Sequence, residues 1–328
     1  MDLYQAYVEL PVATSTEEFS AIALSELRQD YLAKAADGSP VFLLHDSSPA
    51  TYAPAIELRN LTARFHSTCR VVTPREAIED QFAVVSCDSS IPELYELFVR
   101  SFAAVVGGLP QRAGTSDLRN CLQGLLNLFR VLTRPSRREV TGLWAELYVI
   151  SVSERVEAAL QAWHADHFER FDFSSEFGCL EVKATTKERR IHEFSLEQLR
   201  EPTDGRGYVA SLLLRPMTGG VGIMDLATSI EAQLPMEPGV RQKLWENVAA
   251  TLGSDFSERL DYRFDPSYAA RHLAVYAMRD VPAPQVPSDP RITSIRFCAD
   301  LSLVHPFAAG ISGALRTVCV DPVGEKRC

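Results

Sequence analysis

The fold of the second half of this chain is decided by FDFSSEFGCLEVKAT, residues 171–185. Polar and apolar residues alternate on both sides of a short central segment, which predicts two strands. The four residues 175–178 between them include a glycine and have a common hairpin-loop length. The stretch therefore predicts an antiparallel hairpin over roughly 169–186.

The loop length also sets which residues face each other across this hairpin. It pairs Ser174 with Cys179, and counting outward gives the remaining pairs: Phe173 with Leu180, Asp172 with Glu181, and Phe171 with Val182. The apolar residues then share one face, which is the arrangement that fixes register in a half-buried sheet. The other face sets the carboxylates of Asp172 and Glu181 directly opposite each other, with β-carbons roughly 5 Å apart.

Two opposed carboxylates repel each other, so a positive group is expected nearby. Lys183 lies one diagonal step away, and a divalent cation would fit between the two acids. Mg²⁺ favours one or two carboxylates together with phosphate oxygens and water. The alternative is a solvent-facing acid pair balanced by Lys183, because an Asp followed by Glu-x-Lys occurs about once by chance in a chain this long.

A further acid, Glu146, lies inside the helix predicted just before the hairpin. Its neighbours one helical turn away include Leu143 and Ile150, so it sits on or beside the apolar stripe, where an unpaired carboxylate is costly. A metal or a basic group from the hairpin would explain it. A glutamate at the edge of the stripe that reaches water would explain it equally well.

Two residues after the hairpin have open roles. Gln198 follows the Glu-x-Lys strand and could join a catalytic site, but Ser195-x-x-Gln198 is also a capping-box pattern that would start the next helix. His192 could contact a phosphate, although a single loop histidine is more often structural.

The chain carries 33 Lys and Arg against 43 Asp and Glu, a formal net charge of −10, whereas nucleic-acid binders are usually basic. Two runs are locally basic, RVLTRPSRR at 130–138 and KATTKERR at 183–190. Their candidate phosphate-binding residues are Arg134, Arg137, Arg138, Lys187, Arg189 and Arg190. Ordinary solvated faces are the alternative.

The chain divides into two predicted domains. Residues 1–112 predict a mixed α/β domain, with a helix near 16–35, strands at 40–45, 56–65 and 82–87, and a helix at 91–106; the glycine-rich segment 107–116 is the best boundary. Residues 113–328 form the second domain. Beyond the hairpin and its preceding helices at 117–132 and 137–160, the expected elements are helices at 195–201, 222–234 and 238–252 and strands at 207–214, 272–278 and 291–299.

The composition narrows the class of protein. No run of eighteen apolar residues is present, and the first residues show no basic segment followed by an apolar one, so neither a membrane span nor a secretory signal is expected. Seven cysteines without CxxC pairs suit reduced thiols. A cytoplasmic protein without a membrane partner is the expectation.

The site residues together resemble a known group of enzymes. Gly142 and Glu146 in a helix, then Asp172, then Glu181-Val182-Lys183, and the stretch from His192 to Leu199 are similar to the PD-(D/E)XK nuclease superfamily. More closely, they resemble a bacterial family described as PD-(D/E)XK members and often considered part of restriction or anti-phage loci. The resemblance covers about 117–215 well and the C-terminal third loosely. Proline does not precede Asp172, at a position that varies across the superfamily.

The resemblance implies an α/β, mixed α+β fold with a restriction-endonuclease-like core of helix, β-hairpin and sheet, helix and strand. An N-terminal mixed α/β domain and a C-terminal α/β extension would flank this core, and its first strand would be short, near 162–168. It also implies hydrolysis of phosphodiester bonds with Mg²⁺ or Mn²⁺, in DNA more than in RNA. Partners would be nucleic acid and either a second copy of the chain or defence-system proteins.

The resemblance also implies roles for individual residues. Asp172, Glu181 and the carbonyl oxygen of Val182 would hold the metal, which lowers the pKa of a bound water. Lys183 would orient or deprotonate that water, and Glu146 would bind a second metal or orient a water.

Two rival functions stand beside this one. The first is a non-cleaving subunit of a defence complex that binds nucleic acid or protein with the same fold, although such a surface would favour Lys and Arg over paired acids. The second is a metal-independent α/β hydrolase, for which the sequence offers no G-x-S-x-G elbow.

Overall fold

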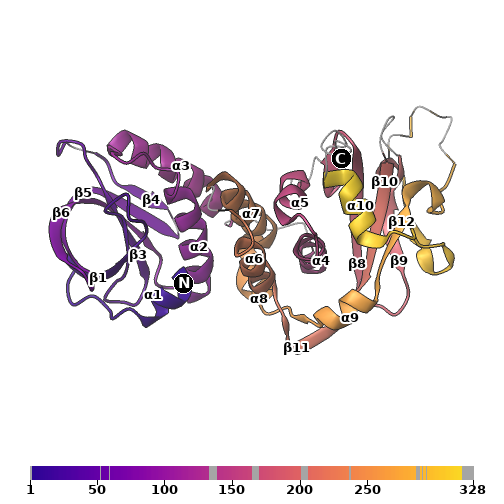
Figure 1. Cartoon of the computed structure of the whole chain (residues 1–328), viewed down its shortest axis with the longest axis horizontal. Coiled ribbons are helices and arrows are strands. Elements are labelled where there is room, and N and C mark those ends of the chain that lie inside the picture. Colours follow the sequence, from indigo (N-terminus) through magenta and orange to yellow (C-terminus); the bar gives the residue numbers. More distant parts are fainter. Residues whose placement is uncertain are drawn as a thin grey trace, which may run out of the picture. The chain divides into compact units, whose positions relative to one another are not determined.

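The computed structural model describes residues 2–51, 53–58, 60–132, 139–164, 170–200, 206–235, 238–285, 289, 291–292 and 294–319. The chain forms two compact units, Met1–Pro135 with Met236–Ala249, and Ser136–Pro235 with Ala250–Cys328 (Figure 1). Both contain helices and sheets, so the mixed α/β class is confirmed. The first unit extends past 107–116, the segment that suggested a boundary.

The first unit is built around a small β-barrel, seen end-on in Figure 1. Its six strands are β1 (Glu18–Ala23), β2 (Tyr31–Lys34), β3 (Pro40–His45), β4 (Ile56–Leu58), β5 (Leu61–Val72) and β6 (Ala77–Cys87). They follow the order β1-β2-β3-β6-β5-β4, and β1 also pairs with β5 in parallel. This extra pairing closes five of the strands into a ring and leaves β4 on the edge of β5.

The predicted helix near 16–35 is wrong, because this segment holds β1 and β2. In β1, Phe19 and Ala21 are buried while their neighbours are more exposed, which is the two-residue period of a strand. Its backbone pairs with β2 on one side and β5 on the other. Pairing with the distant β5 is a tertiary contact that a local pattern does not reveal.

The helices of the first unit pack on the barrel and on one another. They are α1 (Leu3–Glu9), η1 (Pro92–Leu94), α2 (Tyr95–Val106), α3 (Thr115–Val131) and α7 (Pro238–Leu252). Phe102 of α2 stacks on Phe42 of β3 with ring centroids 4.2 Å apart, and Phe98 of α2 contacts Phe42 edge-to-face at 5.5 Å. The predicted helix at 91–106 is confirmed by η1 and α2.

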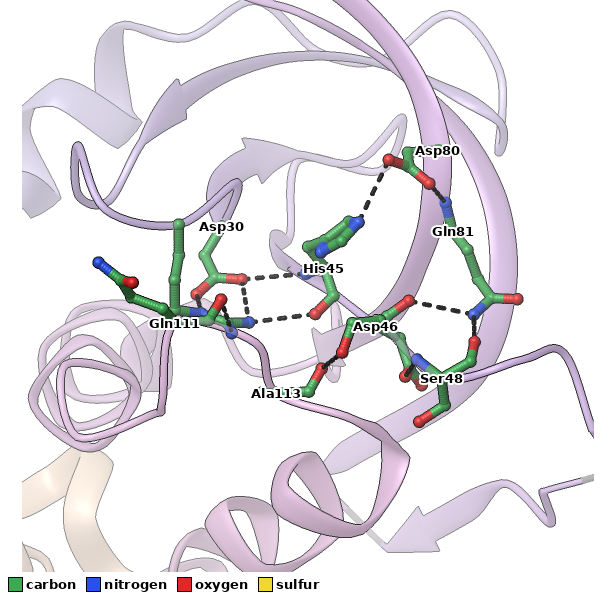
Figure 2. Close-up of polar contacts among 10 residues, drawn as sticks. Asp30, His45, Asp46, Ser48, Asp80, Gln81, Gln111 and Ala113 are labelled. Carbon is green, nitrogen blue, oxygen red and sulfur yellow. Dashed lines mark hydrogen bonds and ion pairs between the residues drawn. The ribbon is translucent and has the colours of Figure 1, made fainter.

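Buried charged groups fasten the loop before α3 to the barrel (Figure 2). The Arg28 guanidinium donates to both carboxylate oxygens of Asp30, at 2.5 and 2.9 Å, and to the carbonyl oxygens of Pro110 and Gln111. The side chains of Arg28 and Asp30 are 5% and 2% exposed. Buried charges need such partners, so the loop is held by this pair.

Asp46 forms a second link to this region, at Thr115, the first residue of α3. Its Oδ2 accepts from the Thr115 hydroxyl at 2.8 Å, and its Oδ1 accepts from the Ser48 N–H at 3.0 Å. Nε2 of His66 lies 3.2 Å from the Thr115 hydroxyl, and His66 has a φ of 54° at the bulge in β5. The glycine-rich segment 107–116 is therefore a bonded part of the first unit.

The second unit contains a four-stranded sheet in the order β12-β10-β8-β7. Its strands are β7 (Phe173–Ser175), β8 (Gly178–Thr185), β10 (Arg206–Leu213) and β12 (Leu273–Ala277). β8 and β10 run parallel, and the two outer strands are antiparallel to their neighbours. A separate antiparallel pair consists of β9 (Ile191–Ser195) and β13 (Arg296–Asp300), and β11 (Pro216–Val221) follows β10.

The helices of the second unit are α4 (Val140–Ser151), α5 (Val156–Ala162), α6 (Ile223–Glu231), α8 (Phe256–Leu260), α9 (Pro266–Arg271) and α10 (Gly310–Cys319), with short turns η2 (Leu196–Leu199), η3 (Gly253–Asp255), η4 (Met278–Asp280) and η5 (Leu301–Leu303). Figure 1 shows α10 running along the sheet. The single helix predicted at 137–160 is wrong: α4 ends at Ser151, Val152 leaves helical geometry, and α5 starts at Val156. The helix predicted at 195–201 is only the 3₁₀ turn η2.

The hairpin register follows the sequence prediction. Phe173 pairs with Leu180, Ser174 with Cys179, and Ser175 with Gly178. A Cβ at Gly178 would lie 2.5 Å from the carbonyl oxygen of Arg206, so this close strand approach requires glycine.

The predicted alternation stops at the start of β7. Phe171 was expected on the face of Phe173 and Val182, but it packs in a cluster with Cys179 and Phe194. The reason is that β7 begins at Phe173, so the chain before it turns instead of continuing as a strand.

Candidate active site

The carboxylate of Asp172 lies at the edge of β8. Its Oδ2 accepts a hydrogen bond from the Val182 N–H at 2.8 Å, and this nitrogen belongs to the peptide bond between Glu181 and Val182. Because β7 begins only at Phe173, which pairs with Leu180, β8 has no paired strand beyond Leu180 on this side within the described residues. Asp172 therefore caps an open strand edge.

The oxygen groups at this edge suit a hard cation. Residues of a strand direct their N–H and C=O alternately to one neighbour and the other, so the Val182 carbonyl points to the same edge as its N–H. The Thr185 carbonyl, three residues on, accepts from Leu214 after β10 and so points to the opposite side. Carboxylate and carbonyl oxygens are ligands that Mg²⁺ and Mn²⁺ accept. Asp172, Glu181 and the Val182 carbonyl are therefore chemically suitable for such an ion.

Glu181 and Lys183 form an ion pair on one face of β8. Lys183 Nζ lies 2.8 Å from Glu181 Oε1; the side chains are 21% and 4% exposed. Lys183 Nζ also lies 5.3 Å from the centroid of the Phe194 ring. The ammonium is thus held at a defined place yet still reaches solvent.

Gln198 joins both members of this pair. Its Nε2 donates to Glu181 Oε1 at 2.5 Å, and its Oε1 lies 3.5 Å from Lys183 Nζ. Its Oε1 also accepts from the Ser195 N–H at 2.9 Å, while the Gln198 N–H donates to the Ser195 hydroxyl at 3.3 Å. A backbone N–H can only donate, so this capping box orients the amide with its NH₂ group toward Glu181. Gln198 therefore forms the predicted capping box and also contacts Glu181 and Lys183.

Glu146 projects from α4 into a buried position, 5% exposed. Its Oε2 accepts from the indole N–H of Trp163 at 2.8 Å. A Cβ at Gly142 would lie 4.0 Å from Glu146 Oε1, which is an ordinary contact and does not require glycine. Among the described residues, no group of three or more His, Cys, Asp or Glu could hold a metal ion together. Glu146 thus does not join Asp172 and Glu181 in a three-carboxylate set.

His192 is an internal residue. It is 4% exposed, and its Nε2 lies 2.7 Å from the Ser211 hydroxyl on β10. Burial, together with the nearby charges of Lys183 and Arg190, lowers the pKa of His192 to about 4 against the opposing effect of Asp300. His192 is therefore neutral near pH 7 and ties β9 to the sheet.

The candidate phosphate-binding residues fall into three groups. Arg134, Arg137 and Arg138 lie outside the described residues. Lys187 is exposed, and Arg189 is 72% exposed but pairs with Asp300 at 2.6 Å. Arg190 donates to the carbonyl and hydroxyl oxygens of Ser211 and to the carbonyl oxygen of His272. In this arrangement Arg190 holds β9 against the sheet.

Two positions of the site were not anticipated from the sequence. Trp163 contacts Glu146 and forms an isolated antiparallel bridge with Phe173, close to where the first core strand was expected; residues 165–169 of that segment lie outside the description. Ser211 pairs in register with Lys183 across β8 and β10. A serine within an apolar strand is a usable signal, because a buried hydroxyl needs a partner.

A cavity of about 410 Å³ lies elsewhere in the second unit. Residues 153–158, Gln161 and Gln233 line it, at the turn between α4 and α5. No residue of the candidate site borders it. The residues of the candidate site thus lie apart from this cavity.

Comparison with known proteins places the chain in a family. Residues 5–302 match the model of the family described as "Putative PD-(D/E)XK family member, (DUF4420)", so the chain belongs to that family. The family in turn is assigned to a superfamily whose members are usually nucleases. Neither the curated proteins nor the solved structures gave a match. No described helix is long and apolar enough to cross a membrane.

Proposed function

We propose that this protein is a metal-dependent nuclease that hydrolyses phosphodiester bonds, and that α4, the sheet β7-β8-β10 and the segment β9-η2 form its restriction-endonuclease-like core. The observation that carries the proposal is the hydrogen bond from the Val182 N–H to the Asp172 carboxylate, on the strand that also bears the Glu181–Lys183 ion pair. Asp172 thus contacts the backbone of the strand that carries Glu181 and Lys183, in a chain of the PD-(D/E)XK family described above.

The residues that would hold Mg²⁺ or Mn²⁺ are Asp172, Glu181 and the Val182 carbonyl. When bound, such an ion polarises the phosphate and lowers the pKa of a bound water. Glu146 is proposed to orient a water from its buried position, with its carboxylate set by the Trp163 indole.

Lys183 is proposed to act on the phosphate and on the attacking water. A charged ammonium donates hydrogen bonds and accepts none, so it can offset negative charge that develops on phosphate oxygens. Glu181 and Gln198 hold Nζ in place before a substrate arrives. Most of the rate enhancement would then come from positioning and electrostatics.

The substrate is proposed to be DNA more than RNA, within a restriction or anti-phage system in the cytoplasm. The acidic net charge of −10 requires that phosphate binding be local, on cations beside the site. A second copy or a defence-system protein remains a proposed partner.

Incubation of supercoiled plasmid with purified protein and Mg²⁺ or Mn²⁺ tests this function. Wild type should convert the plasmid to nicked or linear forms, EDTA should stop the reaction, and Lys183→Ala should be inactive. Cleavage by Lys183→Ala at the wild-type rate would contradict the proposed site. Binding of DNA without cleavage under either metal would favour the non-cleaving subunit instead.

A further inference from the structure

Five exposed arginines of the second unit already pair with carboxylates, at distances from 2.6 to 3.0 Å. They are Arg189, Arg263, Arg291, Arg296 and Arg316. A paired cation offers less to a phosphate because the acid competes for it. In a chain of net charge −10, exposed cations without an acid are therefore the better guide to a phosphate contact.

Lys187, Arg215 and Arg271 are exposed, and none of them forms an ion pair with a carboxylate of the described ranges. They gather at one end of the four-stranded sheet: Lys187 follows β8, Arg215 follows β10, and Arg271 precedes β12. These ends coincide because β8 and β10 are parallel and β12 is antiparallel. Glu188 is the exposed acid next to Lys187 in the chain.

Arg215 is the outer layer of a three-residue stack. Its guanidinium carbon lies 4.0 Å from the centroid of the Tyr268 ring, and the Tyr268 and His272 ring centroids are 4.2 Å apart. The Asp265 N–H donates to the Arg215 carbonyl at 3.0 Å, and the Asp265 carboxylate accepts from the Tyr268 N–H at 3.0 Å. Arg215 and Tyr268 are thus held together through α9.

This stack connects to the candidate site through Arg190. The His272 carbonyl accepts from Arg190 Nη2 at 2.6 Å, and Arg190 Nη1 donates to Ser211 beside Lys183. Arg215 lies four residues beyond Ser211, just past the end of β10 at Leu213.

We propose that Lys187, Arg215 and Arg271 form a rim that binds the phosphates of a nucleic-acid strand leaving the candidate site, and that the Arg215–Tyr268 stack supports one of its unpaired bases. This inference rests on the proposed function and extends it to a strand with at least one unstacked base. A guanidinium plane backed by an aromatic ring is a surface on which any base can stack. Phosphate contacts from the flanking cations add affinity that depends on salt.

Binding in EDTA tests the rim without cleavage. The affinity of full-length protein for a fluorescein-labelled, mixed-sequence single-stranded oligonucleotide is measured by anisotropy across a series of NaCl concentrations. Lys187→Gln and Arg271→Gln should each lower the log–log salt slope by about 0.7, the value for one phosphate contact on a single strand. Arg215→Ala should weaken binding roughly 5- to 150-fold, the range of one lost base stack.

Arg279→Ala is the matched control. Arg279 is exposed and without an ion pair among the described residues, but it follows β12 at the opposite end of the sheet. It should leave affinity and salt slope at wild-type values. An oligonucleotide with abasic sites tests the stack, because its affinity should fall much less on Arg215→Ala.

Each outcome separates the rim from the nuclease. A rim-dependent affinity together with no cleavage in Mg²⁺ or Mn²⁺ supports the rim and rejects the proposed function. If wild type cleaves but Arg215→Ala binds no more weakly than Arg279→Ala, the rim is overturned and the proposed nuclease function stands. Absence of binding to the single strand at any salt concentration overturns the rim, and an equal loss on the abasic strand overturns the base stack.

Discussion

The polar network of the first unit and the hairpin site of the second both bury carboxylates, yet they do so in different settings. Asp30 and Asp46 are buried, and their hydrogen bonds belong to the network that joins the barrel to the segment leading into α3. Asp172 instead lies at a strand edge without a paired strand in the described residues, and Lys183 keeps part of its side chain in solvent. Burial of an acid therefore does not identify an active site. An open strand edge beside a reachable lysine is the more useful sign.

The largest effect is expected in the first unit. Asp30→Ala should destabilise the protein by about 3–5 kcal/mol, because it leaves the buried Arg28 guanidinium without its carboxylate. Urea denaturation followed by circular dichroism measures this. Asp80→Ala is the control: its carboxylate is 46% exposed beside His45, so the cost should stay within about 1 kcal/mol. Equal costs would show that the Arg28–Asp30 pair is no stronger than a surface contact.

Lys183→Ala should have a large effect on cleavage and a smaller one on folding, because Glu181 keeps its hydrogen bond from Gln198. Loss of a group that stabilises developing charge typically lowers kcat by about 10²- to 10³-fold, or about 2.7–4 kcal/mol. Single-turnover cleavage of a labelled DNA substrate and a thermal melt give the two quantities. A variant that loses both activity and several degrees of Tm would mean that the ion pair with Glu181 is structural, like that of Arg28 and Asp30.

His192 predicts a pH effect on stability. Its pKa in the folded protein, about 4, lies below the value of 6.5 expected in the unfolded chain. The unfolded state therefore binds the proton more tightly, so the contribution of neutral His192 is complete above pH 6.5 and is lost as pH falls toward 4. The stability gap between wild type and His192→Gln should shrink over this window by about 3 kcal/mol. A gap that stays constant from pH 7 to 4 would contradict a buried neutral histidine.

The smallest effect concerns the metal. Adding Mg²⁺ at ten times its dissociation constant should stabilise wild type by about 1.4 kcal/mol, and Asp172→Asn should gain much less. Without metal the two should differ by no more than about 1 kcal/mol, since the Asn carbonyl can still accept from the Val182 N–H. Thermal melts in EDTA and across a Mg²⁺ titration measure both differences. If Asp172→Asn melts well below wild type in EDTA, and Mg²⁺ raises the Tm of both proteins equally, then Asp172 is a structural cap and does not bind metal.

The local parts of the fold were predictable from short stretches of sequence. The hairpin register from Phe173 to Leu180 depends on loop length and alternation within fifteen residues, and it is confirmed. The helix at 91–106 is confirmed for the same reason. The prediction failed where a local pattern met a break or a distant partner, at the turn of Ser151 to Val156 and in β1.

The candidate site divides in the same way. Asp172, Glu181, Lys183 and Gln198 come from one continuous segment, where the hairpin pattern and the family resemblance pointed to them, and what they do stays a proposal. Trp163 beside Glu146 could be found only once α4 and α5 had folded back against β7.

The sequence by itself determined the hairpin, its register and the family to which the chain belongs, because these depend on residues close together or on a recognisable motif. Only the tertiary structure decided that β1 closes a barrel with β5, that Ser211 lies beside Lys183, and that Arg215 stacks on Tyr268. The residues in these contacts are far apart in the chain. Ser211 and Lys183 are 28 positions apart, Glu18 and Arg70 are 52 apart, and Arg215 and Tyr268 are 53 apart. Bringing such distant residues together costs loop-closure entropy, and only the packing of the whole unit offsets that cost. A local sequence pattern does not contain this information.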